Sequence, residues 1–326
     1  MKAQKEKGIT LIALVITVVI LIILATVTLN VVLGEGGLIQ RAQQAKDLTE
    51  QATLEEQQGL NTLMDEMANI MAEPPAPEGV PETESYVGYY ADVDGDKQPD
   101  GIIYVDLADT EHTSGRWNND TEGWSDYEYT PVTEGLKQYE VCNESYTGFG
   151  NQWTKPVLTA IEGSEGADRF YVMALEDFNA GTRYCWYDDA YGNLDNPLES
   201  ETVNDFGQGK QNTIDMIANW NSSGYGSQNA NSTYKDMWGV IQTAVGNISD
   251  PTWFVPSKSE WAAFGDFAYT KMGVDTENYV NYGLQGYYWS SAQGDTNHAC
   301  SANFSNGYMS NYGVNGRTYV RLSATF

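Results

Sequence analysis

The longest uncharged run of the chain lies near its N-terminus and predicts a helix that spans a membrane. It extends from Ile9 to Leu33, and the next charged residue is Glu35. A helix of about 25 residues measures roughly 37 Å, enough to cross a hydrocarbon core of about 30 Å with some tilt. Lysines precede the run and most acidic residues follow it. The positive-inside bias therefore places residues 1–8 in the cytoplasm and the remainder outside the cell.

A polar segment with helical periodicity follows the hydrophobic run. Between Leu38 and Met71, apolar residues recur at a loose helical spacing among Gln, Glu and Lys. This pattern predicts that residues 9–71 form one long N-terminal helix, hinged at the glycines near residue 36. Residues 72–85 then hold a cluster of prolines, Pro74, Pro75, Pro77 and Pro81. Such a composition favours a stiff, extended linker, so we expect a domain boundary there.

The remaining residues, 86–326, alternate short strand patterns with few helical ones. Residues 85–91 and 101–107 are rich in Tyr, Val and Ile and predict a hairpin with an acidic turn. Short helices are expected at 214–219, with Asn212 or Thr213 as its cap, and at 235–245. The chain is therefore predicted to have an α+β fold.

The clearest helix signal of this domain is a capping box. Ser257 and Glu260 stand three residues apart in front of a run rich in aromatic residues. In a capping box the two side chains bond each other's backbone N–H groups. We therefore predict a helix from Lys258 to about Met272. From Tyr287 onward the pattern changes to short strands and polar turns.

Charge and composition exclude several classes of function. The formal net charge is −28, which argues against nucleic acid as a partner. The chain has only two histidines, His112 and His298, so a Ser-His-Asp triad or a histidine metal site has few residues from which it could form. Carboxylate pairs such as Asp188 and Asp189 are expected by chance in so acidic a chain. We predict that the protein is not an enzyme. Three cysteines leave at least one free thiol, and a bridge between Cys142 and Cys185 stays open.

The acidic turn of the predicted hairpin is a candidate calcium site. Its carboxylates stand at positions 1, 3, 5 and 9 of the loop: Asp92, Asp94, Asp96 and Asp100. Oxygen ligands at such spacing can converge on a hard cation that prefers six to eight of them. The match to an EF-hand is partial, because Ile103 replaces the glutamate at position 12 and Gly95 stands at position 4. A solvated turn, in which Asp and Gly serve the backbone conformation, is the alternative.

The N-terminus resembles that of type IV prepilins. In that family a peptidase cuts after a glycine that precedes the apolar helix, so the resemblance implies that Gly8 ends the leader and Ile9 becomes the mature N-terminus. The resemblance covers about residues 1–70. Most such pilins have a glutamate at the fifth mature position, which neutralises a neighbouring amine during assembly, but here that position is Ala13. A simple membrane anchor and self-assembly into a filament therefore both stay open.

Residues 86–326 carry a second resemblance. It rests on residues 94–108, on the helix entry from Pro256 to Trp261, and on the strand 288–292 with the closing residues 319–321. These stretches are similar to the C-type-lectin-like fold of the formylglycine-generating sulfatase-modifying family. Catalysis in that family needs two cysteines near the C-terminus. Only Cys300 lies there in this chain, which argues against oxidase activity.

The same fold is used by the variable proteins of diversity-generating retroelements, and residues 302–307 and 316–321 resemble them. These proteins display a mutable set of side chains near the C-terminus. Nearly half of residues 287–313 are Asn, Tyr or Ser. Tyr offers a large contact surface with few torsions to fix, and Ser and Asn offer adaptable hydrogen bonds. Tight turns and half-buried tyrosines would produce the same composition, and that alternative stays open.

We predict a ligand-binding face and a scaffold beneath it. The face comprises Asp295, Asn297, His298, Asn303, Ser305, Tyr308, Ser310, Asn311 and Tyr312, whereas Trp289, Phe304 and Val320 are expected in the core. The expected function is recognition, at the cell surface, of a protein or glycan on another cell or on a phage. The alternatives are a structural pilin-like subunit, in which residues 9–33 also mediate self-assembly, and a formylglycine-generating type of oxidase.

Overall fold

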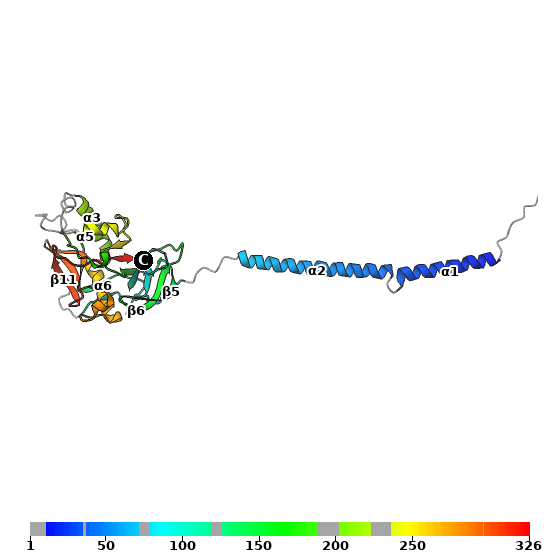
Figure 1. The fold of residues 1–326 in the computed structure, drawn as a ribbon, viewed down its shortest axis with the longest axis horizontal. Coiled ribbons are helices and arrows are strands. Elements are labelled where there is room, and N and C mark those ends of the chain that lie inside the picture. The colour runs from blue at the N-terminus through cyan, green and yellow to red at the C-terminus, as the bar shows by residue number, and fades with distance from the viewer. Residues whose placement is uncertain are drawn as a thin grey trace, which may run out of the picture. The chain divides into compact units, whose positions relative to one another are not determined.

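The computed structural model describes residues 11–34, 37–71, 79–118, 125–187, 202–222, 236–295 and 297–326. The chain divides into two compact units, Met1–Ala76 and Pro77–Phe326 (Figure 1). The described part of the first unit is helical, and the second unit combines sheets with short helices, so the protein is of the α+β class. Gly8 and Ile9 lie outside the described residues.

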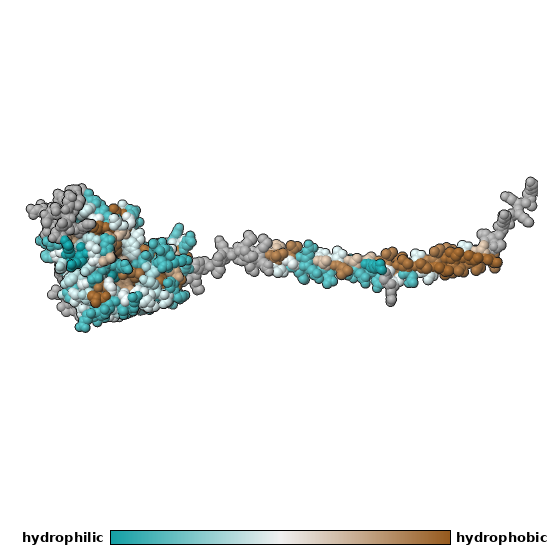
Figure 2. All heavy atoms as spheres, in the orientation of Figure 1, coloured by the Kyte–Doolittle hydropathy of each residue, from teal (hydrophilic) through white to brown (hydrophobic). Residues whose placement is uncertain are grey.

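The first unit contains two helices, α1 (Leu11–Leu33) and α2 (Leu38–Met71). They are separated at the glycines that the sequence indicates, where Gly37 N donates to Gly34 O at 2.7 Å. Hydrophobic side chains cover the face of α1 seen in Figure 2, whereas hydrophilic side chains predominate on that of α2. Among the described residues, the helical stretch that begins at Leu11 is long and apolar enough to cross a membrane. The threonine hydroxyls of α1 bond carbonyls one turn back, as Thr17 does to Ala13 O at 2.7 Å, so these donors would be satisfied inside a membrane.

A seven-stranded sheet forms the centre of the second unit. Its strands, in spatial order, are β5 (Tyr139–Gly148), β6 (Trp153–Ala160), β1 (Tyr90–Asp92), β2 (Gly101–Asp106), β7 (Phe170–Ala174), β12 (Ser323–Thr325) and β8 (Trp253–Phe254). All neighbours are antiparallel except β1 and β6. The last residue of the chain lies inside this unit, because Phe326 O accepts from Arg169 N and Phe170 N at 2.9 and 2.7 Å. A small hairpin of β3 (Ser114–Arg116) and β4 (Asp126–Glu128) stands apart from this sheet.

The predicted hairpin at residues 85–107 exists, but its first strand is shorter than predicted. Strand β1 begins only at Tyr90, which pairs with Ile102, although Gly88 N and Tyr89 O still form hydrogen bonds with the backbone of Ile103. Tyr86 N donates to the carboxylate of Asp106 at 3.1 Å. That carboxylate is fully buried and forms a two-pronged ion pair with Arg169, with distances of 2.8 and 2.9 Å.

Arg169 also attaches the end of the proline-rich segment to the second unit. Its guanidinium donates to Pro81 O at 3.3 Å and to Glu84 O at 2.8 Å. Val80 N donates to Tyr139 O at 2.7 Å. Residues 80–84, which the composition assigns to the linker, therefore pack against the folded domain.

The helices predicted in the second unit are present, although some of them begin or end at other residues than predicted. The capping box of Ser257 and Glu260 is present, and α6 (Lys258–Phe267) continues as a π-helical turn, Ala268–Met272. The other helices are α3 (Gly209–Ser222), α5 (Met237–Val240) and the 3-10 turns η1 (Phe178–Gly181), η3 (Ile241–Thr243) and η5 (Tyr279–Tyr282).

The expected cap of α3 was wrong. Asn212 and Thr213 lie inside the helix and are buried, because each has a tertiary partner that requires it there. Asn212 exchanges hydrogen bonds with the backbone of Val203, and Thr213 Oγ1 accepts from Val255 N at 3.0 Å. These tertiary hydrogen bonds explain why Asn and Thr, which are frequent at helix caps, lie in the interior of this helix.

Helix α6 joins the sheets into one core. Phe264 contacts Tyr104 of β2 on one side and Phe304 on the other, with ring centroids 5.8 and 6.1 Å apart. Trp261 stacks on Tyr288 at 5.0 Å, and its indole N–H donates to Trp289 O at 3.0 Å. The helix therefore fixes the position of the strands that carry the predicted ligand-binding face.

Candidate ligand-binding surface

Three antiparallel strands near the C-terminus carry most of the predicted binding residues. They are β9 (Tyr287–Asp295), β10 (His298–Asn303) and β11 (Tyr308–Gly313), with β10 in the middle. Side chains alternate between two faces along each strand. Tyr288 and Met309 belong to the buried inner face, which packs with α6. Trp289 and Ala299 belong to the opposite face, and a second core cluster covers them there.

The accessible part of this opposite face is a row of side chains along β9 and β11 that we call the tyrosine patch. It consists of Tyr287, Tyr308, Ser310 and Tyr312. The ring of Tyr312 lies 5.5 Å from that of Tyr287 and 5.8 Å from that of Trp289. Small residues on the middle strand, Ala299 and Ser301, leave room for the Tyr312 ring to reach across β10.

Tyr312 is held in place and still accessible. Its side chain is 38% exposed. A Cβ atom at Gly316 would overlap its ring, so the loop after β11 can pass this close only with glycine at that position. A tyrosine that is already fixed by its neighbours loses little conformational freedom on binding.

Asp295, Asn297 and His298 form the exposed turn between β9 and β10. The Asp295 carboxylate accepts from Asn297 N at 2.8 Å and contacts His298 Nδ1 at 2.8 Å. The backbone N–H of Asn297 and the His298 side chain together hold the pKa of Asp295 below its ordinary value. The turn thus presents an ionised carboxylate near neutral pH.

The predicted residues do not form one continuous face. Tyr312 lies opposite Ala299, near the β9–β10 turn, whereas Tyr308 lies opposite Asn303, at the other end of β10. The four residue steps from Ala299 to Asn303 correspond to about 13 Å along the strand. Asn311 is exposed but belongs to the side of β11 opposite Tyr312, and the Cys300 thiol contacts its amide oxygen at 3.5 Å. Ser310 lies between the two ends.

The prediction that Asn303 belongs to the ligand-binding face was wrong. Asn303 is 1% exposed and has no surface to offer a ligand. Its side-chain oxygen accepts from Ser305 N at 3.0 Å and from Ser305 Oγ at 2.6 Å, and Gly307 N donates to its carbonyl. Asn303 therefore fixes the β10–β11 turn, which leaves Ser305 exposed. This is the turn-forming role of Asn that the sequence left open.

The scaffold prediction is confirmed for all three residues. Trp289, Phe304 and Val320 are fully buried. Tyr287, in contrast, was missed as a patch residue, although strict alternation places it on the same face as Trp289 and its contact with Tyr312 confirms the position. The period-two pattern of β9 would have found it.

The acidic turn between β1 and β2 brings three of the four predicted carboxylates together. Oxygens of Asp92, Asp94 and Asp100 lie within 4.8 Å of one another, while Asp96 is outside this group and accepts from Gln98 N at 2.7 Å. Asp92 is buried, and its oxygens accept from Gly95 N and Lys97 N at 2.9 and 3.0 Å. Burial, and then the neighbouring carboxylates, raise the pKa of Asp100 against the opposing N–H donors. A bound cation would relieve this repulsion, because carboxylate oxygens are ligands of hard cations.

Cys300 lacks the environment of a catalytic thiol. All three cysteines lie in the described part of the chain, and none forms a disulfide, so the bridge between Cys142 and Cys185 is not formed. Burial raises the pKa of the Cys300 thiol to about 11. The thiolate is the reactive form, so a thiol in this site is a poor nucleophile at neutral pH.

Comparisons with known proteins found no match to this chain. No family model matches the chain, and no curated protein or solved structure matches it either. The function is therefore inferred from the chain's own surfaces, above all from the tyrosine patch and the acidic turn.

Proposed function

We propose that this protein is a membrane-anchored, surface-displayed binding protein whose C-type-lectin-like domain recognises a ligand without catalysis. The observation that carries the proposal is the tyrosine patch. It combines accessible tyrosines with a neighbouring polar turn on a sheet whose other face is buried against α6. Binding side chains on rigid strands keep their geometry, while a separate core provides stability.

The chemistry of the patch favours a protein or a glycan as the ligand. Tyr308 and Tyr312 offer apolar ring faces and hydroxyl groups, Ser310 offers a small polar group, and Asp295 adds a charge at one end. Both protein surfaces and sugars present apolar faces beside hydrogen-bonding groups. A partner on another cell or on a phage is consistent with display outside the membrane.

The test is to substitute the patch and measure binding. The full chain in lipid nanodiscs would be screened against a glycan array and a phage-displayed library of folded domains. We expect Tyr308→Ala and Tyr312→Ala each to weaken retained ligands at least about tenfold, the usual loss when an aromatic anchor is truncated. Tyr89→Ala removes a half-buried tyrosine outside the patch and should bind like wild type. Unchanged affinity in both patch variants would contradict the proposed surface.

Diversification by a retroelement is part of this proposal, because the strands with the accessible positions are also rich in Asn, Tyr and Ser. Sequencing the DNA around the gene tests it. We expect a near-copy of the 3′ end beside a reverse transcriptase gene, with differences confined to adenines. Differences concentrated at codons for Trp289 or Phe304 would contradict the division into scaffold and variable surface.

We further propose that the acidic turn binds calcium. Three convergent carboxylates, one of them with a raised pKa, support this over a purely solvated turn. For the N-terminal segment we propose a prepilin-like signal, with cleavage after Gly8 and a retained helix that anchors the protein. Assembly into a filament stays the alternative role of this helix.

A further inference from the structure

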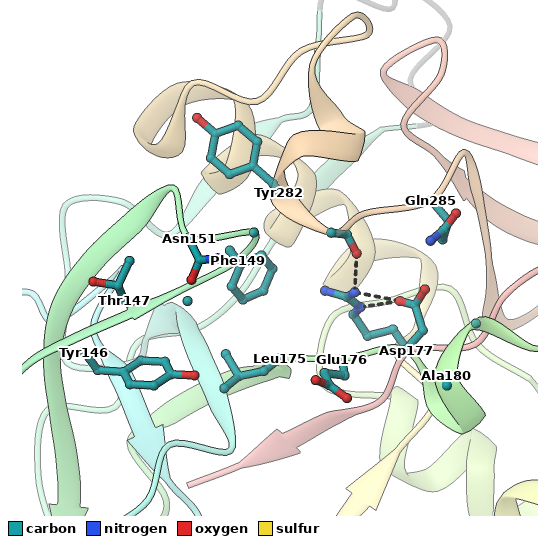
Figure 3. A pocket seen from close by; sticks show the side chains of 15 residues that line it. Tyr146, Thr147, Phe149, Asn151, Leu175, Glu176, Asp177, Ala180, Tyr282 and Gln285 are labelled. Carbon is teal, nitrogen blue, oxygen red and sulfur yellow. Dashed lines mark hydrogen bonds and ion pairs between the residues drawn. The ribbon is translucent and has the colours of Figure 1, made fainter.

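A pocket of about 390 Å³ lies among four segments that are distant in sequence. They are the β5–β6 turn, the residues that follow β7, the loop between η5 and β9, and Arg321. The pocket shares no lining residue with the tyrosine patch or with the acidic turn. Its volume lies at the lower end of the range for small-molecule sites, about 300 to 1,000 Å³. Figure 3 shows its walls, with Tyr146 and Thr147 on one side, Leu175 and Glu176 below, and Tyr282 above.

Arg321 contributes a buried hydrogen-bond donor to this pocket. Its side chain is 1% exposed. Nε and Nη2 pair with Asp177 Oδ1 at 2.8 and 2.7 Å, and Nη2 also donates to Gly283 O at 2.8 Å. Among the described residues, Nη1 has no hydrogen-bond partner. A buried donor without a partner is costly, so an acceptor from outside the chain would be favoured there.

The backbone around the pocket is held in conformations that are rare for side-chain-bearing residues. Among the described residues, six non-glycine residues have positive φ, and three of them line this pocket. They are Phe149, Asn151 and Ala180, with φ of 46°, 62° and 49°. Such strain persists only where the surrounding structure enforces it, and it gathers at ligand sites.

The lining chemistry selects the class of ligand. The charges of Arg321 and Asp177 compensate each other at contact distance, and the exposed carboxylate of Glu176 makes the lining acidic overall. An anion would therefore be repelled. A cation would leave the Arg321 donor without an acceptor. A molecule with several hydroxyl groups can accept from Nη1 and donate to Glu176 at the same time.

Aromatic rings complete the match. Phe149 lies with its ring 5.5 Å from the Arg321 guanidinium, and Tyr146 and Tyr282 line the rim. The C–H faces of a pyranose ring pack well against aromatic rings, while its hydroxyls satisfy the polar groups. We propose that this pocket binds one neutral monosaccharide unit, free or at the end of a glycan, independently of the tyrosine patch and of calcium.

The experiment uses the full chain in nanodiscs, with EDTA present. Glucose, galactose, mannose and N-acetylglucosamine are the neutral probes, and glucuronate and inorganic phosphate are the anionic comparisons. Binding is measured by saturation-transfer NMR and calorimetric titration. We expect at least one neutral sugar to bind with millimolar affinity and both anions to bind more weakly. Glu176→Gln keeps the shape of an exposed side chain and should weaken binding about tenfold. Thr147→Trp should block the rim and abolish binding.

Matched control variants distinguish binding in the pocket from binding at the tyrosine patch and from a general disturbance of β5 and β6. Thr154→Trp loses the same hydroxyl contact to Thr147, at 2.8 Å, but does not line the pocket, so sugar binding should persist. Tyr308→Ala should also bind sugar normally. The proposal is overturned if no neutral sugar binds, if phosphate binds more tightly than the sugars, or if binding survives both pocket substitutions. Sugar binding lost in Tyr308→Ala but kept in Glu176→Gln would assign it to the patch and overturn the pocket.

Discussion

Glu260 is a single residue that connects local helix formation with the packing of a distant segment. It completes the capping box with Ser257, whose backbone N–H donates to it at 2.6 Å. The same carboxylate accepts from Gly207 N and Gly209 N at 3.1 and 3.2 Å, which ties the start of α3 to the start of α6. A carboxylate with this many donors is a structural group, and it explains why a charged residue can be fully buried here.

This residue makes the stability of the domain depend on pH. Burial raises the pKa of Glu260 from 4.5 to about 7, against the opposing effect of the N–H donors of Ser257, Gly209 and Gly207. Because the folded-state pKa is the higher one, its contribution to stability is full below about pH 4.5 and is lost as pH rises through about 7. The change is on the order of 3 kcal/mol in unfolding free energy.

The measurement is denaturant unfolding at several pH values, with tryptophan fluorescence as the readout. All tryptophans lie beyond residue 116, so the signal reports the second unit alone. Glu260→Gln places an amide NH₂ against N–H donors and should be less stable than wild type at pH 5, with a gap that narrows toward pH 7.5. A gap of constant size would show that Glu260 does not titrate in this range.

Single residues also show what the sequence could and could not predict about the surface. Trp289 and Phe304 were predictable as core, because large aromatic residues are costly to leave in water. The burial of Asn303 was not predictable, because asparagine is equally common in turns and on binding faces, so its presence does not distinguish the two. The distinction depends on the short bonds to Ser305, which only the folded turn defines.

Among the elements, the β1–β2 hairpin offers the most direct test of cation binding. If the acidic turn binds Ca²⁺ at the affinity of extracellular modules, then millimolar Ca²⁺ should stabilise the second unit by about 1 kcal/mol relative to EDTA. Asp94→Asn should remove most of this gain. Denaturant unfolding with and without Ca²⁺ measures it.

Asp96→Asn is the matched control for that substitution, because Asp96 lies in the same turn but outside the group of converging oxygens. It should keep most of the calcium effect. A stability that does not respond to Ca²⁺ in the wild-type chain would favour the solvated turn instead. An equal response to Mg²⁺ would show a divalent-cation site that is not selective for calcium and would contradict the proposed calcium site.

Elements were predictable where their signals are local. The capping box defined the start of α6, and the stretches rich in Tyr, Val and Ile on both sides of the acidic turn predicted the pairing of β1 with β2. The order of the seven-stranded sheet was not predictable, because β12 inserts between β7 and β8 through contacts across more than half of the folded domain. The pocket beside Arg321 has the same origin, since its four segments meet only through long-range topology.

At the scale of the whole molecule, the proposed anchor and the proposed binding surfaces lie in different units of the chain. The apolar helix α1 provides a candidate anchor, and the second unit carries the patch, the acidic turn and the pocket. Arg169 fixes the start of that unit through Pro81 O and Glu84 O, so a pull on the linker would act on a buried ion pair with Asp106. The strands of the proposed binding face, β9 to β11, lie elsewhere in the sequence.

The processing of the N-terminus decides how that attachment works. In cells with a prepilin peptidase, we expect the intact mass of the purified protein to correspond to a chain that begins at Ile9 and retains the apolar helix. Gly8→Val should block cleavage and leave residues 1–8 in place, whereas Gly36→Ala, a glycine on the other side of α1, should be processed normally. Both variants should remain in the membrane fraction, because the helix is unchanged. A mature N-terminus beyond Leu33 would instead make the run a removed signal sequence, and the domain would then be secreted without an anchor.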